Sequence, residues 1–423
     1  MVVGVNEHLT GIGVRKLFEF ATAGLPIIFY GGLPSKFHGH AQKGHASANA
    51  TISRLTLLPN VHITPPGVGL ADTLAKIKVT PRTAVTGNGT WYTTWRSDSS
   101  TEYVYVFNDA QNFSSGSIKV ETTGVPYIYD TWTGEITPIL IYKQSSTHTT
   151  ISVRLSGSQS IILAFKHSPR RDKGLHLLSD SVPAPILDIR PGSSSGTLSI
   201  LLTSASTSPI KLRLSTGKII VLSPVKRLAQ AFHLSNWNLT IESWTSPSDP
   251  FDVNSVATLS NLTIISNIKK LLPWNELSSS LENISGRGYY STSFIWPPSP
   301  PRIQDGLQKI ISDQPRLSKG YPGAFLDLGT IVHTARVTVN GHVLPPLDVT
   351  WAHADISSYL QTGVNRVEVV VSTPLGNALR PIWDSLESSG KFAKSQIGAP
   401  EIAGYGLVGS VTIIPYEIVS VSG

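Results

Sequence analysis

Apolar and polar side chains alternate through much of the range 325–416. The first half of this range consists of period-two runs broken by turns, which is the spacing of β-strands. Asn340-Gly341 lies between the runs ARVTV and HVLPP and is typical of a two-residue hairpin turn. Asp355 heads the short helical turn DISSYL, and Gly363 then returns the chain into the strand VEVVV. The pattern predicts β-sheet from one end of this range to the other.

The range 90–166 has a similar strand pattern in shorter pieces. Gly, Ser and Asn turns separate six runs, which are TWYTTWRS, EYVYVFNDA, GSIKVETTG, PYIYDTWTGEITPILIY, TTISVRL and SIILAFK. This spacing predicts a compact antiparallel sandwich. Farther along, TLSILLT, IKLRLS and KIIVLS predict a small additional sheet around the loop PGSSSG, and WNLTIESW and GRGYYSTSFIWPP predict the first strands of the last domain.

A helical pattern is found at the beginning of the chain. Apolar residues recur at helical spacing from Leu9 to Ala23, and LPIIFYGG follows as a buried strand. VHIT at 61–64 predicts a second strand, and GLADTLAKIK at 69–78 predicts a second helix. These elements predict an α/β unit that is too small to close a doubly wound sheet and bury both of its faces. We therefore expect further strands upstream of Met1.

Composition narrows the classes of function. Charged residues make up 14% of the 423 residues, against roughly 25% in a typical soluble domain. The net charge is +7, but the Lys and Arg residues are scattered, which argues against a nucleic-acid partner. No run reaches the roughly 18 apolar residues of a membrane span. Because cysteine is absent, disulfides, cysteine–zinc sites and thiol catalysis are excluded.

Six Asn-x-Ser/Thr sequons favour a secreted glycoprotein. They are headed by Asn49, Asn88, Asn112, Asn238, Asn261 and Asn283. The N-terminal sequence has no basic segment followed by an apolar core, as a secretory signal would have. We therefore expect an extracellular protein whose signal peptide is encoded upstream of this chain.

The order of elements in the range 325–416 resembles that of the sugar-binding, galactose-binding-like jelly roll. This domain accompanies many glycoside hydrolases, including family 2 and, more closely, family 106. The matching segments are LDLG, ARVTVNG, TWAHADIS, GVNRVEVVV, PLGNALRP and GYGLVGSVTIIPY. The earlier segments YVFND and VPYIYDTWTGEITPI are similar to the region after the barrel in fungal and bacterial family 106 proteins. The resemblance in order thus extends over almost the whole chain.

The patterns and this resemblance together predict a mainly β fold in four parts. These parts are a partial α/β (flavodoxin-like) segment at 1–82, an antiparallel β-sandwich at 83–168, a linker with a small β extension at 169–228, and a galactose-binding-like jelly roll at 229–423.

The resemblance implies α-L-rhamnosidase activity on plant-type polysaccharides, inverting and calcium-dependent, for a complete family 106 protein. The catalytic glutamates of that family belong to a barrel that is not in this sequence. We therefore expect the accessory, carbohydrate-binding part of a glycoside hydrolase, with no catalytic residue, cofactor or metal of its own. The alternative is a stand-alone secreted carbohydrate-binding or adhesion protein. In either case the expected partner is carbohydrate rather than nucleic acid or a membrane.

Loop residues of the last domain are the candidates for sugar binding. Aromatic faces stack on pyranose rings, and planar polar groups fix their hydroxyls. The candidates are Trp351, His353, Asn377, Arg380, Trp383 and Tyr405. The loops that follow the runs VTVNGHVLPP and VEVVVST are expected to open at the same end of the domain. For Trp351 a second interpretation stays open, in which the indole fills one end of the jelly roll.

Three other patterns point to turns or loops rather than to chemistry. GSSSG at 192–196 matches a serine-hydrolase elbow, but a β run follows it where the elbow needs a helix. His38, His40 and His45 lie in a small, polar, glycine-rich segment without a nearby acidic residue, which favours loop histidines over a metal site. Asp130 and Glu135 flank Thr-Gly, which predicts a turn between strands.

Overall fold

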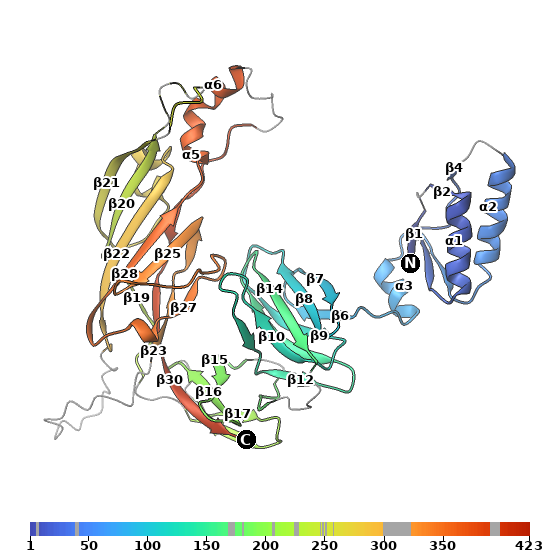
Figure 1. Ribbon diagram of the computed structural model, residues 1–423, viewed down its shortest axis with the longest axis horizontal. Helices are drawn as coiled ribbons and strands as arrows, with labels where there is room; N and C mark the ends of the chain where they lie inside the picture. Colours follow the sequence, from blue (N-terminus) through green and yellow to red (C-terminus); the bar gives the residue numbers. More distant parts are fainter. Residues whose placement is uncertain are drawn as a thin grey trace. The chain divides into compact units, whose positions relative to one another are not determined.

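The computed structural model is a mainly β protein, as predicted, and it divides into two compact units (Figure 1). These are the N-terminal unit, Met1–Arg82, and the large unit, Thr83–Gly423. The structure describes residues 1–5, 8–38, 42–167, 174–179, 182–204, 208–223, 228–245, 247, 249, 252–256, 258–298, 323–389 and 398–423. None of the helices in these ranges is both long and apolar enough to cross a membrane.

The N-terminal unit is a small α/β fold. Its elements are β1 Val2–Gly4, β2 Leu9–Thr10, α1 Gly11–Thr22, β3 Ile27–Tyr30, β4 Phe37–His38, α2 Gln42–Leu55, β5 Val61–Thr64 and α3 Leu70–Lys76. Strands β1, β3 and β5 form a parallel sheet with β3 in the middle. Helix α1 begins where the Thr10 hydroxyl accepts a hydrogen bond from Gly13 N at 3.0 Å. Buried side chains of α1 and α2 pack against the sheet.

Helix α2 corrects the prediction of a histidine-bearing loop. His45 lies within α2 and His38 lies in β4, while His40 is outside the described residues. Ala48, Ile52 and Leu55 recur at helical spacing on α2 and are buried. The interpretation failed because the first half of this helix is small and polar, so its apolar period begins only at Ala48.

The first part of the large unit is a sandwich of two antiparallel sheets. Its strands are β6 Thr83–Gly87, β7 Trp91–Ser97, β8 Thr101–Asn108, β9 Ser114–Val120, β10 Val125–Tyr129, β11 Ile136–Pro138, β12 Tyr142–Gln144, β13 Thr149–Leu155 and β14 Ser160–Lys166. One sheet has the order β11-β10-β14-β8-β7 and the other β12-β13-β9-β6. Their inward side chains form one apolar core. The alternation of burial along β8 and β13 is the period-two pattern of the sequence.

Five short strands and their loops form the next part of the large unit. They are β15 Ile186–Pro191, β16 Thr197–Leu202, β17 Ile210–Arg213, β18 Ile219–Leu222 and β19 Phe232–His233. The GSSSG segment joins β15 to β16 as a hairpin turn, closed by a hydrogen bond from Gly192 N to Thr197 O at 2.9 Å. The turn interpretation of this motif is therefore confirmed, because the segment that follows it is a strand.

The remaining elements complete a second two-sheet sandwich, which we refer to as the jelly roll after the fold predicted for the range 229–423. They are β20 Trp237–Thr245, β21 Thr258–Ile268, α4 Trp274–Leu277, η1 Ser279–Leu281, β22 Gly286–Trp296, β23 Gly323–Asp327, β24 Thr330–Val332, β25 Thr334–Val339, β26 His342–Val343, β27 His353–Asp355, η2 Ser357–Tyr359, β28 Gly363–Ser372, α5 Gly376–Leu379, η3 Arg380–Ile382, α6 Trp383–Ser388, β29 Gly406–Val408 and β30 Thr412–Ser422. One sheet has the order β21-β20-β22-β28-β25-β26.

Strand β30 belongs to two parts of the large unit. It pairs with β16 through one half and with β23 and β19 through the other, giving the sheet order β15-β16-β30-β23-β27 (Figure 1). The small β extension and the jelly roll therefore share one continuous sheet. One short ion pair adds to this connection, because Arg190 of β15 contacts Asp355 of β27 at 2.7 Å. Arg190 also contacts Asp188 of its own strand at 2.7 Å.

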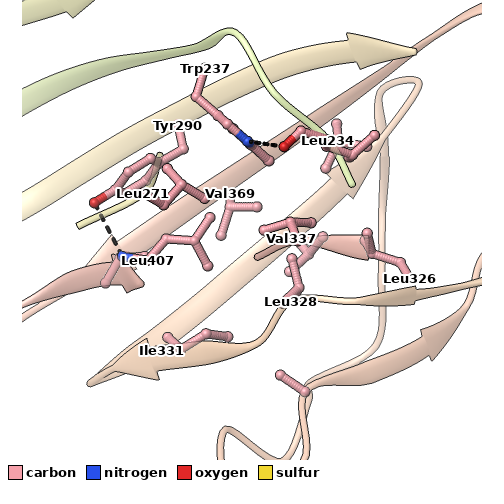
Figure 2. Close-up of a cluster of buried hydrophobic side chains, with 14 of the residues drawn as sticks. Leu234, Trp237, Leu271, Tyr290, Leu326, Leu328, Ile331, Val337, Val369 and Leu407 are labelled. Carbon is pink, nitrogen blue, oxygen red and sulfur yellow. Dashed lines mark hydrogen bonds between the residues drawn. The ribbon is translucent and has the colours of Figure 1, made fainter. Parts of the chain in front are cut away.

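A single apolar core fills the space between the two sheets of the jelly roll. Figure 2 shows Trp237 and Tyr290 within it. The Tyr290 hydroxyl is buried and accepts hydrogen bonds from Trp274 Nε1 at 2.7 Å and from Leu407 N at 3.1 Å. The indole of Trp237 donates to Leu234 O at 3.3 Å. Each of these buried polar groups thus has a partner, as low-dielectric interiors require.

The predicted turns of the last domain are confirmed. Asn340 and Gly341 have φ values of 50° and 82°, and they join β25 to β26 as a two-residue hairpin. The Asn340 amide also donates to Tyr359 O and Asn365 Oδ1, both at 2.8 Å. The Asp355 carboxylate accepts a hydrogen bond from Ser357 N at 3.0 Å at the start of the short helix η2. These turns fix the loops that connect the two sheets.

Candidate functional site

The six predicted site residues fall into two separate groups. Trp351 and His353 lie at the start of β27, whereas the other four lie on or after the helices α5 and α6. Figure 1 shows α5, which follows β28, well apart from β27, which follows the loop after β26. The expectation that the two loops open at the same end is therefore wrong.

In the second group, the structure uses Asn377 and Tyr405 for the fold itself. The buried Asn377 amide donates to Ala403 O and accepts from Ala403 N, both at 2.9 Å. The buried Tyr405 ring lies edge-on to Trp274 at 6.3 Å. Because these polar and aromatic groups are enclosed, their surfaces are not presented to a ligand.

The other two members of this group are partly exposed and lie beside carboxylates. Arg380 Nη1 is 3.9 Å from Glu282 Oε1, and Trp383 Nε1 donates to Glu387 Oε1 at 3.1 Å. The arginine and the tryptophan thus each face an acidic partner. At this end of the domain, Trp383 is the only partly exposed aromatic residue among the four predicted ones, and its indole N–H is bound to Glu387.

The first group forms an aromatic platform that includes a residue from the sandwich. The Trp351 and His353 rings are stacked, with centroids 4.3 Å apart and planes 21° apart. Phe113, from the loop between β8 and β9, lies 6.3 Å from Trp351 with an interplanar angle of 31°. Trp351 is 40% exposed and Phe113 is 52% exposed. We refer to Phe113, Trp351 and His353 as the aromatic platform.

Hydrogen bonds hold the platform loop against the sandwich. Asp348 Oδ1 accepts from Thr350 N at 2.9 Å and from the Thr350 hydroxyl at 2.6 Å. Asp348 Oδ2 accepts from Gln159 Nε2 at 3.1 Å, and Gln159 is buried in the sandwich. The Trp351 amide donates to Asp348 O at 3.0 Å. The backbone that carries Trp351 is therefore held both within its own loop and by the sandwich, so less of this loop has to be ordered on binding.

The imidazole of His353 forms the buried end of the platform. Burial lowers the pKa of His353 below its ordinary value, while the Asp327 carboxylate, 3.4 Å away, acts in the opposite direction. The ring is consequently uncharged at neutral pH. A neutral ring stacked on Trp351 stabilises the position of the indole.

Sequence reasoning found Trp351 and His353 but not Phe113. Phe113 stands in the polar segment NDAQNFSS, and an isolated aromatic residue among turn formers was the available signal. Its nearness to Trp351 depends on contacts between the sandwich and the jelly roll, which a strand pattern does not contain. The exposure of Trp351 also means that it does not simply fill the end of the jelly roll.

The described carboxylates and histidines have local roles. No group of three or more His, Asp or Glu side chains placed to hold a metal occurs within the described ranges. Asp130 Oδ1 accepts from Trp132 N at 2.8 Å and from Thr133 N at 3.2 Å, which confirms a turn at this site.

Comparison with solved structures supports the mainly β, multi-sheet fold. The chain is similar to the structure of a rhamnosidase from Novosphingobium sp. PP1Y, with a TM-score of 0.55 and 17% sequence identity. The match covers 98% of this chain and 33% of that one, so the chain spans about a third of the length of that rhamnosidase. At this identity the likeness concerns the fold alone.

Other similar structures are more distant. A β-glucuronidase from Faecalibacterium prausnitzii matches 44% of this chain and 32% of its own, at 16% identity and a TM-score of 0.25. An exo-carrageenase from Bacteroides ovatus matches 40% of this chain and 22% of its own, at 8% identity and a TM-score of 0.23. We draw no argument from scores this low. No protein-family model and no curated protein matches the sequence.

Proposed function

We propose that this chain is the accessory, carbohydrate-binding part of a glycoside hydrolase related to α-L-rhamnosidases, acting on plant-type polysaccharides. The aromatic platform carries the proposal, because exposed and rigidly held aromatic faces suit the C–H faces of sugar rings. The fold likeness to a rhamnosidase over 98% of the chain supports the relationship. The resemblance of its segment order to family 106 supports the same assignment.

Secretion belongs to the same proposal. Asn49, Asn88, Asn112 and Asn283 are exposed, as glycosylation requires. Asn238 is exposed as well, but it lines the polar groove described below, so no glycan is proposed there. The sixth sequon asparagine, Asn261, lies in β21, and its side chain is outside the described residues. Exposure at these four sites supports an extracellular, glycosylated protein.

Replacement of Trp351 by alanine is expected to weaken glycan binding about tenfold, or ~1.4 kcal/mol. The reason is that the substitution removes the central ring of the platform. The measurement is calorimetric titration of the full chain with rhamnose-terminated and rhamnogalacturonan oligosaccharides. Binding itself should be weak, since a single exposed site must offset the ordering of a flexible sugar.

The matched control for this experiment is Trp132→Ala. Trp132 is 48% exposed in a sandwich turn, so this variant removes a similarly exposed indole from outside the platform. Its variant should bind as the wild type does. Unchanged affinity of the folded Trp351→Ala variant, or an equal loss in both variants, contradicts a role for the platform.

The full chain is expected to leave aryl α-L-rhamnosides unhydrolysed. The physical reason is that a glycosidase needs two carboxylates across the scissile bond, and Asp130 and Glu135 are part of a strand-connecting turn. Release of the aryl group is followed by absorbance at a high protein concentration. Turnover that disappears when a carboxylate of this chain is replaced would overturn the accessory assignment.

A further inference from the structure

A polar groove lies on the six-stranded sheet of the jelly roll, in a different place from the aromatic platform. Its volume is about 430 Å³, and its lining consists of Asn236, Asn238, Ser291, Thr292, Ser293 and Arg366. Asn236 directly precedes β20, and the other lining residues come from β20, β22 and β28, which are neighbours in the sheet (Figure 1). Every lining side chain can form hydrogen bonds, which is unusual for a pocket that binds an apolar ligand.

The strand register arranges the groove residues in rows across the sheet. Asn238 is opposite Ser291, and Ser291 is opposite Glu368. The next row places Ser293 opposite Arg366. Along β22 and β28, buried residues alternate with these exposed or half-buried ones, so the rows lie on the face turned away from the core. Donors and acceptors are thereby repeated at the spacing of neighbouring strands, roughly 4.8 Å.

The arginine that lines the groove has a carboxylate partner. Arg366 Nη2 is 2.8 Å from Glu368 Oε1, two residues away on the same face. The Asn236 side-chain oxygen is likewise occupied by the ammonium group of Lys269. A guanidinium beside a carboxylate offers both donors and acceptors, which matches a pair of adjacent hydroxyls better than it matches an anion.

An apolar pair lies beyond the polar rows. Ile295 and Val364 are directly opposite each other in the register, and each is 60% exposed. They follow Ser293 and precede Arg366 by two residues, so they lie on the same outer face. A ligand that extends along the groove therefore meets hydroxyl-binding groups first and an apolar surface next. Sugar rings have this combination, because their edges carry hydroxyls and their faces carry C–H groups.

We propose that this groove is a second binding site of the chain, specific for neutral oligosaccharides. The proposal rests on the carbohydrate-binding function proposed above and adds a site and a ligand class. Asn238, Ser291 and Ser293 bind ring hydroxyls, the Arg366–Glu368 pair bridges adjacent hydroxyls, and the Ile295–Val364 pair contacts the C–H face of the following ring.

The test is a titration of the full chain with defined oligosaccharides. Cellotetraose, xylotetraose, mannotetraose and a rhamnose-terminated trisaccharide serve as neutral probes, and trigalacturonate serves as the anionic probe. Four proteins are compared, which are the wild type, the double variant Ser293→Ala/Arg366→Ala, the control Arg336→Ala and the platform variant Trp351→Ala. Arg336 is an exposed arginine on β25 in the same sheet, outside the groove lining, so it controls for general loss of positive charge.

At least one neutral probe is expected to bind the wild type, and the double variant should raise its dissociation constant at least fivefold. Arg336→Ala and Trp351→Ala should leave this affinity unchanged for the probe that uses the groove. Affinity should also depend little on salt, since the ligand has no charge. Cooperative thermal unfolding of each variant shows that the effect is not a loss of folding.

The outcomes separate the groove from the platform. If the double variant binds every neutral probe as the wild type does while Trp351→Ala loses binding, the groove proposal fails and the proposed function stands. If Ser293→Ala/Arg366→Ala loses binding and Trp351→Ala does not, the groove stands and the platform fails. Binding of no probe at millimolar concentration overturns both, and tighter, salt-sensitive binding of trigalacturonate overturns the assignment to neutral ligands.

Discussion

Replacement of Tyr290 by phenylalanine is expected to lower the free energy of unfolding of the large unit by about 2–4 kcal/mol. The hydroxyl of Tyr290 accepts a hydrogen bond from Leu407 N inside the core, as Figure 2 shows, and a second one from Trp274 Nε1. The variant leaves both donors buried without an acceptor, at a cost of ~1–3 kcal/mol each. Urea unfolding followed by tryptophan fluorescence measures the difference.

Tyr289→Phe is the control, because it removes a hydroxyl from the adjacent residue of the same strand. The Tyr289 hydroxyl donates to Glu242 Oε2 at 2.7 Å, but both side chains are reached by water. Water can replace this bond, so the expected cost is less than about 1 kcal/mol. Equal destabilisation by the two variants would show that the buried donors are not the cause.

The second large effect is expected for Asp355→Asn, which should destabilise the large unit by about 1–3 kcal/mol at pH 7. The Asp355 carboxylate is 2.7 Å from Arg190 Nη1 and accepts hydrogen bonds from Ser357 N at 3.0 Å and from the Tyr416 hydroxyl at 3.1 Å. Asparagine keeps the shape of the side chain. It removes the negative charge and introduces an NH₂ group among donors, so some of these contacts are lost.

The effect of Asp355 has a defined pH dependence. Burial acts to raise the pKa of Asp355, but the hydrogen bonds from Ser357 and the Arg190 guanidinium outweigh it, so the pKa is lower than in the unfolded chain. A lowered folded-state pKa contributes stability that is present above the unfolded pKa, about 3.9, and is lost as the pH falls through the folded value. The difference between wild type and variant should therefore be constant from pH 7 to 5 and shrink below about pH 4.

Asp188→Asn is the matched control, because Asp188 is the other carboxylate bound to Arg190. Its side chain is 40% exposed, against 24% for Asp355. Solvent screening should limit its cost to less than about 1 kcal/mol. If unfolding at pH 7, 5 and 3 gives the same curve for both variants, the partial burial of Asp355 is not what makes its ion pair important.

Local sequence patterns were sufficient for most of the strands. Period-two burial on β22 and β28 follows directly from their sequences, and Asn340-Gly341 identified its hairpin. The pairing of β16 with β30 could not be found in this way, because the two strands are separated by the entire jelly roll. Helix α2 was missed for a local reason. Its first half is small and polar, so the helical spacing of its apolar residues begins only at Ala48.

The candidate sites also depend on contacts between residues that are distant in the sequence, which a local pattern does not contain. Trp351 was recognisable as an aromatic residue in a loop, but its partner Phe113 comes from another domain. Asn238 was predicted only as a sequon asparagine, and the register also places it on the wall of the groove. Nothing in the sequence distinguishes Ser291, Ser293 and Arg366 from other strand residues that point outward. They form a site only because β20, β22 and β28 pair in the observed register.

The position of β30 in the chain affects how the protein is made. β16 ends at Leu202, whereas β30, its partner, begins only at Thr412. At roughly 5–20 residues per second, a ribosome needs on the order of tens of seconds to synthesise the segment between them. The sandwich can fold during this interval, because all of its strands have emerged. One edge of β16 stays unpaired until β30 arrives, and an open strand edge is a template for aggregation, so the nascent chain should depend on chaperones that cover this edge.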